Sequence, residues 1–397
     1  MHMKGAFRLD IDKKQDILAL FGAFDNSSLP VRNRFVRSAT YLGGADEATG
    51  KLSEAEIGRC AEVAAGGAGT IISGMAYVSA EGKALARQWG LHCDERTEDV
   101  RVFAKAVHKF NSRLVVQLCH AGGQKYAGAA GESEAFTPSG LKHPGCECAT
   151  KAMTAEDLRK VRADFAAAAL RAKQGGADAV EIHGGHGFLF TQFLSPSFNK
   201  RADQYGGSLE NRMRLFREVM SDVKKAVGPS FPVWFKFSAE EGTQGGYGVG
   251  EGLAAARQLL ADGADGADVS SGAPYAGGQH IPSVIGVSAG ESEAPFREYA
   301  KELKKCARPG QLVILTGGLR SLELMAGLLR GSYCDLFGIS RPFNCEPDLV
   351  NRWAEDDSRP SACVSCNACF STLRSGLLDC PVMRERNEGE WDPMPEF

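Results

Sequence analysis

The stretch "AEDLRKVRADFAAAALRAKQGGADAVEIHG" (residues 155–184) decides the fold class of this chain. In its first part, apolar residues recur at the spacing of a helix with one buried face, and two glycines then end the pattern. The second part, "ADAVEIHG" (177–184), is a short aliphatic run of the kind that forms a buried strand. A strand with a helix packed against it is therefore the predicted unit of the fold.

This unit recurs along the chain. Similar apolar runs lie at residues 33–40, 67–74, 113–120, 232–239, 266–272, 312–318 and 334–341, and helical patterns such as "SEAEIGRCAEVAAGG" (53–67) separate them. Eight strand–helix units predict an α/β protein with a (β/α)₈ TIM barrel, which takes about 250 residues plus insertions. A doubly wound open sheet is the alternative, but no G-x-G-x-x-G follows the first predicted strand.

The composition is that of a soluble globular protein. The chain has 397 residues, 43% of them hydrophobic and 24% charged, and a net charge of -3. This charge gives no reason to expect nucleic acid or a membrane surface as a partner. The first residues contain no sustained apolar run followed by a cleavage site, so we expect a cytoplasmic protein. The twelve cysteines do not form a recognisable disulfide pattern, so we expect mostly reduced thiols.

The carboxyl ends of the barrel strands are where active sites of this fold lie. In this chain they carry amide, hydroxyl, imidazole and cationic groups and glycines: Ser38, Ala39, Thr40, Gly74, Gln117, His120, His183, His186, Lys236, Gly317, Gly318, Ser340 and Arg341. Carboxylates are almost absent from these ends, which argues against a glycosidase or a hydrolytic metal centre. The glycine pair and Arg341, after the last two strands, are suited to a phosphate. With Gln117 and Lys236 facing a polar ring, flavin mononucleotide (FMN) fits the whole set.

Several of these stretches together resemble the old yellow enzyme family of flavin-dependent ene-reductases. They are "VRNRFVRSAT" (31–40), "GGAGTIISG" (66–74), "VVQLCHAG" (115–122), the block from Gly176 to Phe216, "TGG" (316–318) and "ISRPF" (339–343). The resemblance implies FMN in the barrel mouth, reduced by NADH or NADPH, and hydride transfer to an activated alkene. It also implies a place for each predicted cofactor residue. Ser38, Ala39 and Thr40 would lie along the flavin, Gly74, Gln117 and Lys236 would contact its ring, and Gly317, Gly318, Ser340 and Arg341 would hold its phosphate.

His183 and His186 match the histidine pair of the family, which donates hydrogen bonds to a substrate carbonyl or nitro oxygen. A zinc site would need at least a third ligand. Two residues after the second histidine, where the family usually has a tyrosine that donates a proton, this chain has Phe188, which has no proton to give. Water or one of three tyrosines would then be the donor: Tyr41, Tyr247 or Tyr275.

Four cysteines crowd the end of the chain. Cys363, Cys366, Cys369 and Cys380 are separated by two, two and ten residues, a spacing that favours a bound metal over disulfides. The pattern resembles the 2,4-dienoyl-CoA reductase and trimethylamine dehydrogenase branch, which implies a [4Fe–4S] cluster; structural zinc is the alternative. We therefore expect an FMN-binding barrel over residues 1–355 and a Cys-rich extension over residues 356–397.

The leading prediction is an FMN-dependent oxidoreductase that takes hydride from NAD(P)H and reduces the C=C bond of an activated small molecule. The alternative is a flavin and iron–sulfur dehydrogenase or demethylase that runs in the oxidative direction with an external electron-transfer protein. A third reading makes the barrel the scaffold of an electron-transfer or redox-sensing module. We also expect a homo-oligomer, and long loops at residues 122–151 and 272–294 that cover the flavin.

Overall fold

The fold is a closed barrel of parallel strands. A computed structural model describes residues 13–25, 28–126, 134–146, 148–290 and 292–383. The barrel strands are β1 (Phe35–Arg37), β2 (Thr70–Ile72), β4 (Arg113–Cys119), β7 (Ala179–Gly184), β8 (Val233–Ser238), β9 (Gly266–Ser270), β10 (Leu312–Thr316) and β11 (Leu336–Ile339). They pair in the order β2-β1-β11-β10-β9-β8-β7-β4, and a pairing of β2 with β4 closes the ring. The predicted TIM barrel is confirmed.

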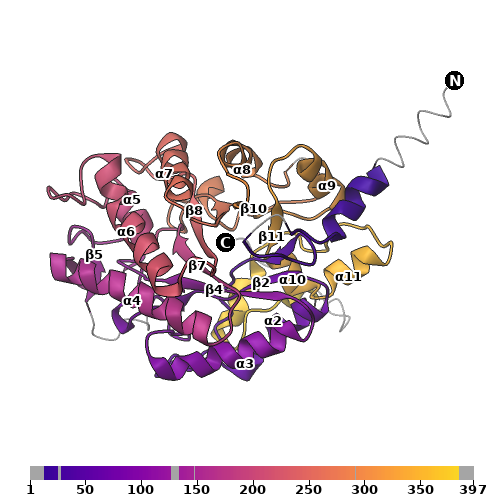
Figure 1. Cartoon of the computed structure of the whole chain (residues 1–397), viewed down its shortest axis with the longest axis horizontal. Coiled ribbons are helices and arrows are strands. Elements are labelled where there is room, and N and C mark those ends of the chain that lie inside the picture. Colours follow the sequence, from indigo (N-terminus) through magenta and orange to yellow (C-terminus); the bar gives the residue numbers. More distant parts are fainter. Residues whose placement is uncertain (1–12, 26–27, 127–133, 147, 291, 384–397) are drawn as a thin grey trace.

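Helices follow the strands and surround the barrel (Figure 1). They are α2 (Glu54–Ala65), α3 (Thr97–His108), α4 (Ala155–Gln174), α5 (Leu189–Leu194), α6 (Leu209–Val227), α7 (Val249–Ala261), α8 (Arg297–Lys304), α9 (Leu322–Arg330), α10 (Arg341–Cys345) and α11 (Leu349–Ala354). Three short strands lie outside the ring: β3 (Ala76–Tyr77) on β4, and the pair β5 (Ala135–Thr137) and β6 (Thr150–Ala152). Residues 13–21 form a further helix.

Local sequence explains why helix α4 begins and ends where it does. Thr154 and Asp157 form a capping box, in which each side chain accepts a hydrogen bond from the backbone of the other. At the other end, Gly176 has φ of +94°, a conformation that residues with a side chain rarely adopt. The chain can therefore turn sharply from α4 into β7, which contains His183 and ends two residues before His186.

The barrel interior changes from apolar to polar along the strands. Its lower layer is formed by buried side chains from seven strands: Val36, Ile72, Val115, Ala179, Trp234, Leu312, Ile314 and Leu336. Residues two apart on a strand point to the same side, so the next inward positions form the layer above. That layer contains Ser38, Gly74, Gln117, Glu181, Lys236, Asp268, Thr316 and Gly338. The apolar layer closes the bottom of the barrel, and the polar layer forms the floor of its mouth.

The predicted Cys-rich extension packs on the barrel mouth. The backbone N–H of Leu378 donates to the carbonyl of Leu42, and Arg59 of α2 forms an ion pair with Asp379 at 2.6 Å. Cys369 and Leu378 are buried. The outer ends of the two predicted regions, residues 1–12 and 384–397, lie outside the described residues.

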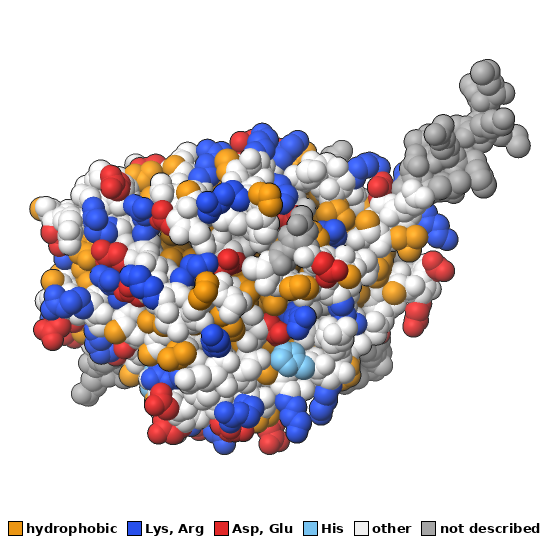
Figure 2. Space-filling model, viewed as in Figure 1, with side chains coloured by type: hydrophobic (Ala, Val, Ile, Leu, Met, Phe, Trp, Pro, Cys, Tyr) orange, Lys and Arg blue, Asp and Glu red, His pale blue; other side chains and the backbone are white. Residues whose placement is uncertain are grey.

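On the face shown in Figure 2, acidic and basic side chains are interspersed. Within the part of the chain that the structure describes, no helix combines the length and apolar character needed to cross a membrane.

The apolar layer should carry a large share of the stability of the barrel. Trp234 is fully buried in it, and we expect Trp234→Ala to lower the free energy of unfolding by about 3–5 kcal/mol, because it leaves a cavity that rigid strands cannot fill. Denaturant unfolding of wild-type and variant protein, both saturated with FMN, measures this. Val102→Ala, at an exposed position of α3, is the control and should change the free energy by less than about 0.5 kcal/mol. Equal effects of the two substitutions would contradict the role of this layer.

Candidate active site

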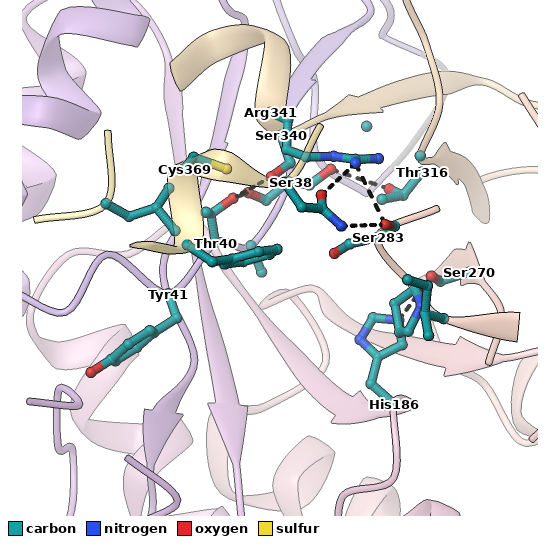
Figure 3. Close-up of a pocket in the computed structure, with 18 of the residues that line it drawn as sticks. Ser38, Thr40, Tyr41, His186, Ser270, Ser283, Thr316, Ser340, Arg341 and Cys369 are labelled. Carbon is teal, nitrogen blue, oxygen red and sulfur yellow. Dashed lines mark hydrogen bonds between the residues drawn. The ribbon is translucent and has the colours of Figure 1, made fainter. Parts of the chain in front are cut away.

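A cavity of about 470 Å³ opens at the carboxyl ends of the strands. Its size lies within the range of about 300–1,000 Å³ that is usual for small-molecule sites. Nine of the twelve predicted catalytic and cofactor-binding residues line it: Ser38, Ala39, Thr40, His186, Lys236, Gly317, Gly318, Ser340 and Arg341. In Figure 3, His186 and Ser270 lie on one side of this cavity, apart from Ser340 and Arg341.

Three predicted residues lie behind the cavity wall instead. Gln117 is buried, and its amide donates to Oε1 of Glu181 at 2.7 Å. A Cβ at Gly74 would lie 3.0 Å from the carbonyl oxygen of Thr40, so this glycine allows a close backbone approach. His183 is 4% exposed and packs below His186. Gly74 and Gln117 therefore support the wall, and their direct contact with a cofactor stays a prediction.

Hydroxyl groups and glycines form one end of the cavity. Thr40 and Ser340 share a hydrogen bond of 2.9 Å, which joins the ends of the first and last strands. Gly317 and Gly318 have φ of +109° and +70°, and a Cβ at Gly318 would lie 2.6 Å from the ring of Pro295. A side chain is thus excluded from this turn, which leaves its backbone open to the cavity.

Two arginines lie at the same end. Arg341 donates to the carbonyl of Val284 at 2.9 Å and to Oδ1 of Asn367 at 2.7 Å. Arg320, which the sequence reasoning missed, is 1% exposed and also lines the cavity. It donates to the carbonyl of Cys363 at 3.0 Å and to the side chain of Ser365. In the sequence, its position two residues after the glycine pair could have identified it as a cavity residue. Two guanidinium groups beside an open glycine turn fit a phosphate group.

Lys236 forms the floor of the cavity together with buried acids. Its ammonium donates to Oδ2 of Asp268 at 2.5 Å, and both side chains are almost fully buried. Glu181 lies beside this pair, and burial followed by the charge of Asp268 raises its pKa. The strand ends are poor in acids, as expected, but these two acids lie in the same polar layer as Lys236. Their positions two residues before His183 and Ser270 on inward-facing strands were the signal for them.

The histidine pair is held in a neutral form. The rings of His183 and His186 lie 5.1 Å apart, and burial lowers the pKa of His183 to about 3 and that of His186 well below its ordinary value. His186 has φ of +58°, and its backbone N–H donates to Oγ of Ser238 at 2.9 Å. Its Nε2 lies 2.8 Å from Oγ of Ser270. This network fixes the imidazole of His186 against the cavity, and no side chain or backbone group of the described residues bonds to its other ring nitrogen.

Phe188 lines the cavity, and its ring lies 4.9 Å from that of His183. Of the three tyrosines considered as proton donors, Tyr41 alone lines the cavity. Tyr247 is 2% exposed and donates to the carbonyl of Ser238, while Tyr275 donates to Glu241 at 3.1 Å. Tyr126, which was not considered, is a second phenol in the wall. Burial raises the pKa of both Tyr41 and Tyr126, so both hold their protons at neutral pH.

The C-terminal cysteines surround a second, small cavity. It is lined by the four predicted ligands and by a fifth thiol from α10: Cys345, Cys363, Cys366, Cys369 and Cys380. The sulfur of Cys345 lies 3.1 Å from that of Cys380, and its hydrogen bonds lower the pKa of Cys363 and of Cys380. No disulfide joins the cysteines in the part of the chain that the structure describes. Thiols of this kind suit a thiolate-bound metal, but within the described ranges no three His, Cys, Asp or Glu side chains are placed to hold a metal ion.

The donors of the main cavity fit FMN. A cationic floor suits the polar edge of a flavin, and the glycine turn with two guanidinium groups suits its phosphate. The structure thus brings together at one cavity the residue types that the sequence predicted for this cofactor.

Comparisons with known proteins agree with this site. The profile of the NADH:flavin oxidoreductase / NADH oxidase family matches residues 19–359. The chain is 32% identical over 353 residues to an NADH oxidase from Thermoanaerobacter brockii, a match that covers 88% of this chain and 52% of that protein. It is 30% identical over 322 residues to an NADPH dehydrogenase from Halalkalibacterium halodurans, covering 81% of this chain and 90% of the other.

A solved structure has the same overall fold. The 6-hydroxypseudooxynicotine amine oxidase of Pseudomonas geniculata N1 superposes with a TM-score of 0.80 at 26% identity, covering 95% of this chain and 56% of that one. The chain spans about half the length of this amine oxidase and of the NADH oxidase. The resemblance carried by the sequence motifs is confirmed. The chain belongs to the NADH:flavin oxidoreductase / NADH oxidase family, which is the old yellow enzyme family.

Proposed function

We propose that this protein binds FMN and uses NAD(P)H to reduce the C=C bond of a small activated alkene, such as an α,β-unsaturated carbonyl compound. The observation that carries this proposal is the neutral imidazole of His186, fixed by Ser270 at the wall of a cavity whose floor is Lys236. When bound, FMN would supply the hydride chemistry that connects the nicotinamide to the alkene.

The residues of the chain have distinct tasks in this proposal. Lys236 places a positive charge at the polar edge of the flavin, while Arg320, Arg341 and the glycine turn hold its phosphate. His186 donates a hydrogen bond to the substrate oxygen, which increases the positive character of the alkene β-carbon. Tyr41 or Tyr126 then gives a proton to the α-carbon, because Phe188 has none.

An oxidative reaction is the second candidate. It is favoured by the likeness to an amine oxidase over nearly the whole chain and by Phe188 in the expected position of a proton donor. In this case the substrate would lose a hydride to the bound flavin, and an external electron-transfer protein would take up the two electrons. Anaerobic bleaching of the flavin by an amine, without any reoxidation by alkenes, would replace the first proposal with this one.

We also propose that the C-terminal thiols bind a metal centre, either a [4Fe–4S] cluster or zinc. The support is the shared cavity of five cysteines and the low pKa of Cys363 and Cys380. Cys369 lines both this cavity and the main one, so a centre here would adjoin the flavin site. A homo-oligomer and an electron-transfer partner stay part of the proposal.

Replacing His186 should slow the half-reaction in which the alkene reoxidises the reduced flavin. We expect His186→Ala to slow reoxidation of the reduced flavin by 2-cyclohexenone by about 10²-fold, the usual cost of one lost oxyanion donor, and to change reduction by NADPH much less. Anaerobic stopped-flow absorbance measures the two halves separately. The imidazole pKa is lowered, so the wild-type rate should show no inflection near pH 6.5. Equal losses in both halves, or a histidine inflection at that pH, would contradict the role of His186.

Phe188→Tyr should return a proton donor to the cavity wall. We expect reoxidation by 2-cyclohexenone to speed up at least about tenfold, because general acid catalysis contributes about 10²–10⁴ and the tyrosines in the wall would supply part of it. The same stopped-flow assay measures this, and Phe188→Leu serves as the control for altered packing. An unchanged rate in Phe188→Tyr would show that proton transfer does not limit the reaction.

The metal proposal is tested by chemical analysis of protein purified without oxygen. We expect about four irons and four sulfides for a cubane cluster, or about one zinc, and loss of the metal in Cys363→Ser. The control is Cys306→Ser, which changes an exposed thiol at the end of α8 and should retain the metal. Metal-free wild-type protein, or metal retained in Cys363→Ser, would contradict the proposed site.

A further inference from the structure

Two buried carboxyl groups lie next to each other under the floor of the main cavity. Glu181 of β7 and Asp268 of β9 are both 0% exposed, and they flank the stem of Lys236 on β8. Gln117 donates to Oε1 of Glu181 at 2.7 Å, and Lys236 donates to Oδ2 of Asp268 at 2.5 Å. One oxygen of each carboxyl group is thus satisfied by a donor of the chain.

The remaining two oxygens have no such donor. Oε2 of Glu181 and Oδ1 of Asp268 are buried and have no hydrogen-bond donor among the described residues. The carboxyl groups of Glu181 and Asp268 nevertheless interact with each other, and this interaction raises the pKa of Glu181. Two ionised carboxylates offer only lone pairs, so this contact would be repulsive. A single proton between the two oxygens turns it into a hydrogen bond and satisfies both.

We propose that Glu181 and Asp268 share one proton, and that this proton keeps the buried group formed with Lys236 neutral overall. The charges support this. With both acids ionised, the group would carry one uncompensated negative charge in a site closed to water, which is costly. With one shared proton, the ammonium of Lys236 balances the single negative charge of the pair.

The groups that face Glu181 act on its pKa in opposite directions, and their net effect is to raise it. Burial and the charge of Asp268 raise its pKa, while Lys236 and the amide of Gln117 lower it by less. His183, further along β7, is neutral. No other cation is available to compensate the second acid, because Lys236 is the one cation that acts on Glu181 within the described residues.

The shared proton would determine the net charge of the buried group that lies next to the bound flavin. Lys236 lines the cavity, whereas the carboxyl pair lies behind it, so the cavity receives the positive end of a neutral group. This consequence rests on the proposed binding of FMN. Glu181 and Asp268 are positioning residues in this view, because they act on the cofactor through Lys236.

Infrared spectroscopy tests the proton directly. We expect wild-type protein at neutral pH, with and without FMN, to show the carbonyl stretch of a protonated carboxyl group that shifts in D₂O. Glu56 is another buried acid whose pKa is raised, to about 7, so the band is identified by its loss in variants. It should disappear both in Glu181→Gln, whose amide replaces the proton as donor, and in Asp268→Asn. A band that is absent in wild type, or that survives in both variants, would overturn the proposal.

The midpoint potential of bound FMN tests the net charge of the group formed by Glu181, Asp268 and Lys236. If the pair shares a proton, Glu181→Gln leaves the net charge unchanged, and its potential should differ from wild type no more than that of Glu210→Gln, an exposed control on α6. The double variant Glu181→Gln/Asp268→Asn leaves Lys236 uncompensated, and its potential should rise. A rise in Glu181→Gln alone would show that a full carboxylate charge had been removed, which contradicts the shared proton.

The two readouts separate this inference from the proposed function. Protein that does not bind FMN would overturn the flavin proposal, but the infrared test would still apply. If the protein binds FMN but does not reduce alkenes, the proposed reaction is wrong. Both tests of the shared proton can still be carried out. If Glu181→Gln does not fold, Asp268→Asn gives the same infrared result.

Discussion

The buried ion pair between Lys236 and Asp268 is the interaction on which the site depends. Both residues lie in the barrel interior, where removal of one partner from such a pair costs about 3–5 kcal/mol because the other charge stays uncompensated. The pair also fixes the ammonium of Lys236 at the floor of the cavity. Gln117, Glu181 and the histidine pair are arranged around it, so the polar layer of the barrel is one connected structure.

Closure of the barrel allows this layer of charged and polar side chains to be buried. The strand pairings β7 to β8 and β8 to β9 place residues of neighbouring strands in fixed register, and the apolar layer with Trp234 excludes water from below. In such surroundings charges interact strongly and histidines remain neutral. The same environment that imposes a cost on the acids therefore prepares His186 to act as a hydrogen-bond donor.

The C-terminal extension links the two cavities. Arg320 lines the main cavity and donates to the backbone of Cys363, and Cys369 lines both cavities. A change in the thiol site would therefore reach the phosphate end of the flavin site through direct contacts. This arrangement gives a physical reason for a family member to carry cysteines at the barrel mouth.

Sequence alone determined the barrel, the glycine turn and the histidine pair. These features depend on local spacing: apolar runs of strand length, two consecutive glycines, and histidines three residues apart at a strand end. It also identified Lys236 and Arg341, because the fold places strand ends at one face.

Tertiary structure decided which groups meet. Glu181 and Asp268 come from different strands, Cys345 precedes the cysteine motif, and Arg320 reaches back to the extension. Gln117 and His183 do not line the cavity because they pack against other side chains, Gln117 against Glu181 and His183 against His186 and Phe188. Such contacts depend on strand register and packing across the barrel, which one chain read in order does not specify.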